Sequence, residues 1–269
     1  MTGMNLMTGA IGVVAVAALG LGVYGLQDAE PVVAPTPPAA TLGLVDDLDR
    51  EVLQTEIRRY MLENPEIIME AVQVLEARQT ADAQNAELQM VRNSADALIN
   101  DGYSFVGGNP DGDVTLIEFL DYQCSFCKRA HPEVANLLTQ DGNIRLIVKE
   151  FPILGPVSEA ASRAAMAVLL EQGPELYHEF NDQMMRFPGR LDDTIIDNLA
   201  ERAGADVAAM RDRMDDRDIT QQIAQNKALA EQLQITGTPT FVLGDTMIRG
   251  YLPLEQMAEA VRLTRSAAR

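Results

Sequence analysis

The sequence predicts an α/β protein whose sheet is interrupted by a long all-helical insert and preceded by a separate helical segment. Three patterns support this fold class: a strand–helix–strand unit over residues 114–151, helical periodicity over about 156–233, and a β-hairpin pattern over 238–249. The first pattern is a βαβ unit, and the third adds two strands after the insert.

The composition is that of an ordinary globular protein, with 47% hydrophobic and 23% charged residues and a formal net charge of −19. Nucleic-acid phosphates require clustered Lys and Arg, so this charge argues against a nucleic-acid partner. The same argument applies to an anionic membrane surface. We interpret the acidic residues as a solvated surface that favours solubility.

The N-terminus begins with an apolar run over residues 10–26 that contains no charge. Such a run is typical of a secretory signal or of a single membrane anchor, and for residues 1–27 both interpretations stay open. Either one predicts an exported, periplasmic protein, tethered to the inner membrane if the segment is retained. Four prolines among Ala, Val and Thr then predict an extended linker over residues 28–43.

Residues 44–100 predict two helices, because apolar residues recur at helical spacing and Asn64-Pro65-Glu66 has the pattern of a helix start. Between Arg78 and Glu87 the apolar stripe thins, which indicates a solvated stretch or a flexible connector. Two helices of this size cannot bury such a stripe by themselves. The stripe therefore packs either on the downstream domain or on other copies of the chain.

The remaining chain, residues 103–269, is predicted to form one domain. Its elements are, in order, a short strand over 103–106, a buried strand over 114–120, a helix over about 124–138, a strand over 144–151 and, after the insert, a final helix over 254–266. This order places a Cys-x-x-Cys motif at the turn from the buried strand into the following helix.

The chain has only two cysteines, Cys124 and Cys127. One pair cannot form a disulfide framework, and closing so short a loop would add little stability. The two histidines, His131 and His178, are not grouped in the short-spaced pairs that a zinc site requires. We therefore expect no metal and no cofactor.

A redox role follows from the position of the motif. At a helix N-terminus, Cys124 meets free backbone N–H groups and the positive end of the helix dipole, and Lys128 and Arg129 add positive charge. These features favour the thiolate that attacks a disulfide, while Cys127, one turn further, can resolve the mixed disulfide. The motif predicts a thiol–disulfide oxidoreductase.

Residues 118–130 closely resemble the active-site segment of DsbA-like oxidoreductases, and the resemblance continues through 148–155 and 236–241. Members of this family have a thioredoxin fold interrupted by a helical insert. The resemblance therefore implies a thioredoxin-like fold over residues 103–269, with the insert at about 156–233.

The resemblance also implies further site residues. The peptide bond before Pro239 is expected to be cis and to lie against the cysteine pair, with the Thr238 backbone available to a substrate peptide. Glu118 is expected beneath the site, where a raised pKa lets it assist proton transfer at the resolving cysteine. Periodicity alone leaves Glu118 facing either inward or outward. Lys149 is a candidate partner for it.

One residue departs from the pattern of the family. Strongly oxidising members have a histidine immediately before the second cysteine, whereas this chain has Phe126. Because Phe126 cannot supply the positive charge that stabilises the thiolate, the resemblance does not extend to a very oxidising potential.

Residues 58–72 resemble the N-terminal domain of ScsC-like and Com1-like members, some of which form trimers. This resemblance favours interpreting residues 44–100 as an oligomerisation domain. It predicts a homotrimeric isomerase or reductase that acts on exported proteins with cysteines and is kept reduced by a membrane redox partner. The alternative is a monomeric or dimeric oxidase recharged by a quinone-linked membrane protein. A third interpretation is a copper-binding or chaperone-like protein that uses the cysteines as soft ligands.

Overall fold

The computed structural model describes residues 47–267, and the expected signal or anchor (1–27) and linker (28–43) lie outside this range. Contacts divide the chain into two units, with the boundary after Pro65. The second unit thus begins with residues that the sequence assigns to a helical domain over 44–100, and those domain limits stay a prediction. No helix among the described residues is long and apolar enough to cross a membrane.

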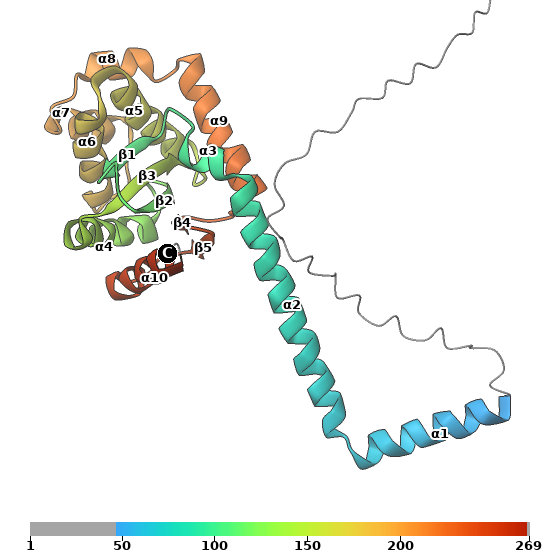
Figure 1. Ribbon diagram of the computed structural model, residues 1–269. Helices are drawn as coiled ribbons and strands as arrows, with labels where there is room; N and C mark the ends of the chain where they lie inside the picture. Colours follow the sequence, from blue (N-terminus) through green and yellow to red (C-terminus); the bar gives the residue numbers. More distant parts are fainter. Residues whose placement is uncertain (1–46, 268–269) are drawn as a thin grey trace, which may run out of the picture. The chain divides into compact units, whose positions relative to one another are not determined.

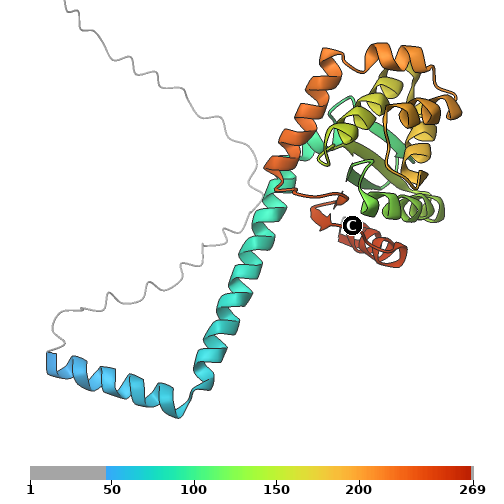
Figure 2. The ribbon, with the colours of Figure 1, turned by 180° about the vertical axis from the view of Figure 1, so that it is seen from behind.

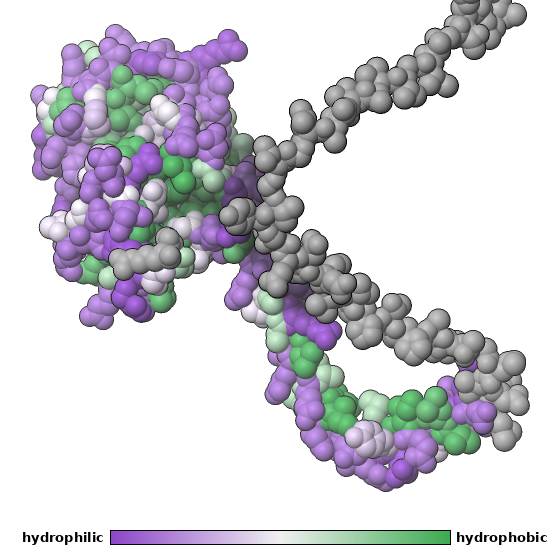
Figure 3. Space-filling model, in the orientation of Figure 1, coloured by the Kyte–Doolittle hydropathy of each residue, from purple (hydrophilic) through white to green (hydrophobic). Residues whose placement is uncertain are grey.

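The first unit contains helix α1 (Asp47–Glu63). Arg59 binds Glu56 and Glu63, one turn before and one turn after it, and this pairing stabilises the polar face of the helix. The large apolar side chains of α1 remain exposed, and Figure 3 shows the hydrophobic surface that they form. They are Val52, Leu53, Ile57, Tyr60, Met61 and Leu62.

The second unit begins with helix α2 (Glu66–Asn93) and the short α3 (Ala95–Ile99). α2 is continuous through the stretch where the apolar stripe thins, so residues 78–87 form an exposed helix and no connector. Its first turns expose apolar residues, whereas Val91 in its last turn is buried against the sheet together with Leu98 of α3. Figures 1 and 2 show α2 joining the sheet at this end.

The sheet has five strands in the order β1-β3-β2-β4-β5. Their bounds are β1 (Phe105–Gly108), β2 (Val114–Leu120), β3 (Ile144–Glu150), β4 (Thr240–Leu243) and β5 (Thr246–Arg249). β2 and β3 are parallel and the other pairs antiparallel. β1 begins two residues later than predicted, because Asp101 accepts hydrogen bonds from the N–H groups of Tyr103 and Ser104 and holds them in a turn.

The two faces of the sheet are covered by different helices. Alternate residues of β2, including Leu116 and Leu120, pack with α4 (Ser125–Asp141), α10 (Leu254–Ala267) and the first helices of the insert. Ile117 and Phe119 point to the opposite face, where they pack with α3 and with the last helix of the insert. The turn between β2 and α4, which holds Cys124, packs on the first of these faces.

The insert consists of five helices and agrees with the predicted range of about 156–233. It comprises α5 (Pro156–Gln172), α6 (Pro174–Arg186), α7 (Asp193–Arg202), α8 (Val207–Arg213) and α9 (Arg217–Gln232). α5 is the central helix: its buried residues are mostly alanines and serines, whose small side chains let neighbouring helices approach closely. Gly173, at a φ of 101°, ends α5 and allows the chain to turn into α6.

Candidate active site

The turn between β2 and α4 is held by Asp121. This buried carboxylate accepts hydrogen bonds from the backbone N–H of Gln123 at 2.8 Å, from those of Ile153 at 2.8 Å and Leu154 at 3.0 Å, and from the Ser158 hydroxyl at 2.7 Å. It therefore fastens the turn to the β3–α5 loop and to the first turn of α5. Sequence reasoning missed this role, because its partners are distant along the chain.

Both cysteines are free thiols placed at the start of α4. Cys124 is the N-cap residue, and its Sγ lies 3.1 Å from the carbonyl oxygen of Thr238. Cys124 is 7% exposed and Cys127, in the first turn, is 0% exposed. Only the first sulfur is therefore within reach of a second protein.

The environments of the two sulfurs shift their pKa values in opposite directions. Hydrogen bonds, first from the Cys127 thiol and then from the Thr238 side chain and the backbone N–H groups at the start of α4, lower the pKa of Cys124 to about 5. Burial, the Cys124 sulfur and Glu118 raise the pKa of Cys127 well above its ordinary value. At neutral pH the pair consists of one thiolate and one thiol.

The segment facing Cys124 is the start of β4. The Thr238–Pro239 peptide bond is cis, as the resemblance implies. The carbonyl of Pro239 accepts a hydrogen bond from Gly250 N at 2.8 Å, which ties this segment to the end of β5. The Thr238 backbone thus lies at the sulfur that a substrate would approach.

Glu118 lies inside the protein, in the middle of β2, between Val148 of β3 and Phe241 of β4. It is 3% exposed and points to the sheet face on which Cys127 packs. Burial, the nearby Glu150 carboxylate and Cys124 raise the pKa of Glu118 to about 8. A carboxyl group with such a pKa can exchange a proton near neutral pH.

Lys149 is not the partner of Glu118. Because side chains alternate along a strand, Lys149 of β3 points to the opposite face from Glu118. Its ammonium group donates to Asp101 at 2.6 Å and to the carbonyl of Ala97 at 2.8 Å. The suggestion from the sequence was therefore wrong, and Lys149 anchors the segment around α3.

The next residue along β3, Glu150, is a buried acid that sequence reasoning missed. It accepts hydrogen bonds of 2.7 Å from the hydroxyls of Tyr122, Tyr177 and Ser162. Burial is the main cause that raises the pKa of Glu150 to about 7. The cluster joins the active-site turn, which holds Tyr122, to α5 and α6. An acid in a predicted buried strand was the available signal.

The cations and histidines near the motif are engaged elsewhere. Lys128 donates to the carbonyls of Phe187 and Gly189, at 2.8 and 3.0 Å. Arg129 stacks on a tyrosine ring, and His131 pairs with an aspartate. The remaining histidine, His178, stacks on a phenylalanine ring. In the described part of the chain, no three His, Cys, Asp or Glu residues form a group that could hold a metal ion.

Apolar side chains surround the reactive turn on its solvent side. Phe126, between the cysteines, is 56% exposed. Ile153 and Leu154, in the loop fastened by Asp121, are also exposed. Solvated apolar residues next to a reactive sulfur provide a surface on which unfolded polypeptide can lie.

Comparisons with known proteins agree with this geometry. A DSBA-like thioredoxin domain model matches residues 115–262. The N-terminal domain model of the copper resistance protein ScsC matches residues 49–81. A thioredoxin-like oxidoreductase from Silicibacter pomeroyi has 38% sequence identity and a TM-score of 0.61, covering 64% of this chain and 97% of that one. ScsC from Proteus mirabilis in a compact conformation has 28% identity and a TM-score of 0.62, covering 81% and 99%.

Among curated relatives, the Na(+)/H(+) antiporter NhaA 1 of Salinispora arenicola is 30% identical over 158 residues, which are 58% of this chain and 24% of the antiporter. The chain thus spans about a quarter of the length of the first curated relatives it matches. The DSBA-like match covers more than half of the chain and confirms both the predicted fold and the resemblance. The chain therefore belongs to the DSBA-like thioredoxin domain family.

Proposed function

We propose that the protein is a thiol–disulfide oxidoreductase that acts on exported proteins with cysteines, working as a disulfide isomerase or reductase. The main support is the contrast between the two sulfurs: Cys124 is partly accessible with a pKa of about 5, and Cys127 is buried with a raised pKa. This is the division of labour that disulfide exchange requires, with one nucleophile and one protected resolving thiol.

The first step is attack by the Cys124 thiolate on one sulfur of a client disulfide. A Cys124–client disulfide forms, the client S–S bond breaks, and the second client sulfur leaves as a thiolate. In reduction, Cys127 then loses its proton and attacks Cys124. The Cys124–Cys127 bond forms, the first client sulfur leaves as a thiolate, and two electrons have passed to the client.

Isomerisation omits the resolving step. A different client thiolate attacks the client sulfur of the mixed disulfide, so a new client disulfide forms and Cys124 leaves as a thiolate. The client gains no electrons overall, and the protein returns to its dithiol form. A low pKa for Cys124 also makes it a good leaving group in this step.

Glu118 and the Thr238–Pro239 segment have supporting roles in this proposal. The Glu118 carboxylate accepts the proton of Cys127 during resolution, since it lies on the same sheet face and titrates near neutral pH. The carbonyl oxygen of Thr238 lies 3.1 Å from the Cys124 sulfur, and the Thr238 backbone pairs with the client chain. Glu118 and the Thr238–Pro239 segment are given these roles because both lie near the cysteine sulfurs.

Two features favour isomerisation or reduction over oxidation. Phe126 cannot act as a cation beside the thiolate, so the Cys124 thiolate is stabilised by hydrogen bonds without the added positive charge that strongly oxidising members have. The exposed apolar residues of α1, together with the ScsC N-terminal match over residues 49–81, support assembly into a homotrimer. Several active sites within one assembly can hold a client through successive exchanges.

Export and a membrane partner belong to the same proposal. A similar solved structure, with 26% identity and a TM-score of 0.60, is a periplasmic thioredoxin-like protein from Salmonella enterica serovar Typhimurium. An exported reductase requires a membrane redox partner that returns electrons to Cys124 and Cys127. The oxidase alternative requires a partner that removes them.

The deciding experiment combines thiol trapping in cells with refolding of scrambled ribonuclease. A mostly reduced Cys124–Cys127 pair and recovery of ribonuclease activity from the scrambled form are expected. A mostly oxidised pair, with activity only on fully reduced ribonuclease, would establish the oxidase alternative. A Cys124→Ser, Cys127→Ser chain gives the background, and no difference from it would refute both enzymatic functions.

A further inference from the structure

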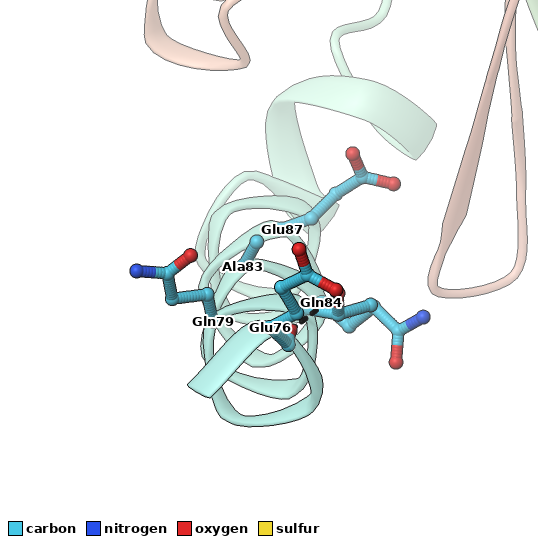
Figure 4. A pocket seen from close by; sticks show the side chains of 6 residues that line it. Glu76, Gln79, Ala83, Gln84 and Glu87 are labelled. Carbon is cyan, nitrogen blue, oxygen red and sulfur yellow. Dashed lines mark hydrogen bonds between the residues drawn. The ribbon is translucent and has the colours of Figure 1, made fainter. Parts of the chain in front are cut away.

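Two hollows in the surface of the second unit differ in what lines them. The larger, about 630 Å³, lies along the exposed part of α2 and is lined mostly by glutamate and glutamine side chains (Figure 4). One of these, Glu87, is already bound to Arg249. The smaller, about 300 Å³, adjoins the active-site turn and is lined by Gln123, Leu154, Pro156, Val157 and Arg190. The second hollow is here called the Arg190 cleft.

Three segments form the Arg190 cleft, and each is fixed to the active-site turn or to α4. Gln123 immediately precedes Cys124. Leu154 and the first turn of α5 are fastened by the Asp121 carboxylate. The α6–α7 loop, which holds Arg190, is fastened to the first turn of α4 by the two hydrogen bonds from Lys128.

Two polar groups in this cleft lack partners. Arg190 is exposed, and it makes neither an ion pair nor a hydrogen bond with any residue between 47 and 267. The side-chain Nε2 of Gln123 is buried and has no hydrogen-bond partner within the same range. The buried Nε2 has no surface that a client atom can touch, so Arg190 is the group of the cleft that an acceptor from outside the chain can pair with. A carboxylate provides acceptors and the charge that complements Arg190.

We propose that the Arg190 cleft binds the client polypeptide beside its reacting cysteine and selects clients with an acidic side chain there. Leu154 and Val157 supply apolar contact, and Arg190 pairs with the client carboxylate. This inference rests on the proposed function and names the client class for the same site. This preference for acidic clients acts locally at Arg190, against the net charge of −19, which repels acidic peptides from the protein as a whole.

The test uses single-cysteine peptides activated as 2-thiopyridyl disulfides, in three versions with Asp, Asn or Lys next to the cysteine. The Cys124 thiolate attacks the peptide sulfur, a Cys124–peptide disulfide forms, and the thiopyridine sulfur leaves as 2-thiopyridone, whose absorbance gives the rate. Each rate is divided by that of the same peptide with 2-mercaptoethanol, which removes differences in intrinsic reactivity.

The reduced full-length protein should react about two- to fivefold faster with the Asp peptide than with the Asn peptide, the size expected of an exposed ion pair. Arg190→Gln should bring this ratio to about one, and Arg190→Glu should invert it. The matched control is Arg202→Gln, which removes the same charge from another exposed arginine, on α7. The ratio should be unchanged in that variant.

The two proposals fail in different ways. If the Asn peptide reacts well but the Asp peptide shows no advantage, the inference about the Arg190 cleft is overturned and the proposed function stands. An equal loss of preference in the Arg190→Gln and Arg202→Gln variants would also overturn it, because only long-range charge would then matter. If no peptide reacts faster than with the Cys124→Ser chain, the proposed function itself is overturned.

Discussion

Helix α1 exposes apolar side chains to solvent, whereas the sheet of the second unit buries ionisable ones. α1 leaves Leu53 and Ile57 half exposed, at 55% and 50%. The strands β2 and β3 instead bury two carboxyl groups, Glu118 and Glu150, at 3% exposure each. Both arrangements are unfavourable for an isolated chain, since apolar surface gains free energy on leaving water and a carboxylate loses it.

The comparison shows two ways in which function lowers stability. An exposed apolar face becomes favourable only when another surface covers it, so it indicates assembly. A buried acid stays unfavourable in its charged form, so it indicates proton transfer. Each interpretation can be tested by one substitution that removes the unfavourable group.

The largest effect is expected from Glu118→Gln. Without the carboxylate, Cys127 loses its proton acceptor, and release of the client from the mixed disulfide should slow by about 10²-fold. Trapping the mixed disulfide by acid quench measures this step. The wild-type rate should rise with pH up to the pKa of Glu118. This pKa lies at or below about 8 in the mixed disulfide, because there Cys124 no longer carries the charge that helps to raise the pKa of Glu118. The variant should lack this rise.

The same substitution should increase stability. The folded-state pKa of Glu118, about 8, lies above its ordinary value of 4.5, so the folded protein binds more protons between these two values. Glu118 therefore contributes a fall in wild-type stability as pH rises through this window, and Glu118→Gln should remove that contribution while the one from Glu150, whose pKa is also raised, remains. Urea unfolding at pH 5 and pH 8 measures it. The exposed Glu179→Gln is the control, and an equal pH dependence in all three chains would contradict the assignment.

A smaller effect on activity, together with a change of oligomeric state, is expected from Ile57→Glu in α1. A charge in a face buried between copies is strongly unfavourable, so the oligomer should dissociate. Light scattering gives the mass, and scrambled-ribonuclease refolding should fall while thiopyridyl exchange at Cys124 remains. Thr55→Glu adds the same charge on the opposite side of the helix and should leave the oligomer intact. A wild-type protein that is already monomeric would refute the trimer.

The smallest effect concerns the Glu150 cluster. Tyr122→Phe removes one hydrogen bond to the Glu150 carboxylate and leaves Asn181 without its tyrosine partner. The free energy of unfolding should fall by about 1–3 kcal/mol. Urea denaturation checks the value. Tyr251→Phe, which removes a hydrogen bond to Glu133 outside the cluster, is the control, and an equally small change in both variants would show that the cluster contributes nothing to stability.

Local patterns predicted the framework of this fold. The strand before Cys124, the helix after it, the all-helical character of the insert and the hairpin all follow from periodicity and turn residues. The cis bond at Pro239 followed only from the resemblance, because Thr-Pro alone does not predict it. The reactive pair was predictable because its chemistry requires the two sulfurs to be close in sequence.

The supporting residues were harder to predict, because they contact one another across long stretches of chain. Asp121 binds residues about thirty positions away, and Glu150 is satisfied by tyrosines from two other elements. Lys149 was misplaced because charge alone suggested a pairing that the alternation of strand faces forbids. Contacts of this kind become visible only when the topology fixes which segments are neighbours.

The hydrogen bonds of Asp121 also have an evolutionary consequence. Its carboxylate is shared by donors at residues 123, 153, 154 and 158, so one added residue in the β3–α5 loop would move two of the donors out of reach. Relatives that retain this aspartate should therefore keep the length of that loop constant. Insertions and deletions should accumulate instead in the connection between α7 and α8, which Asp121 does not contact.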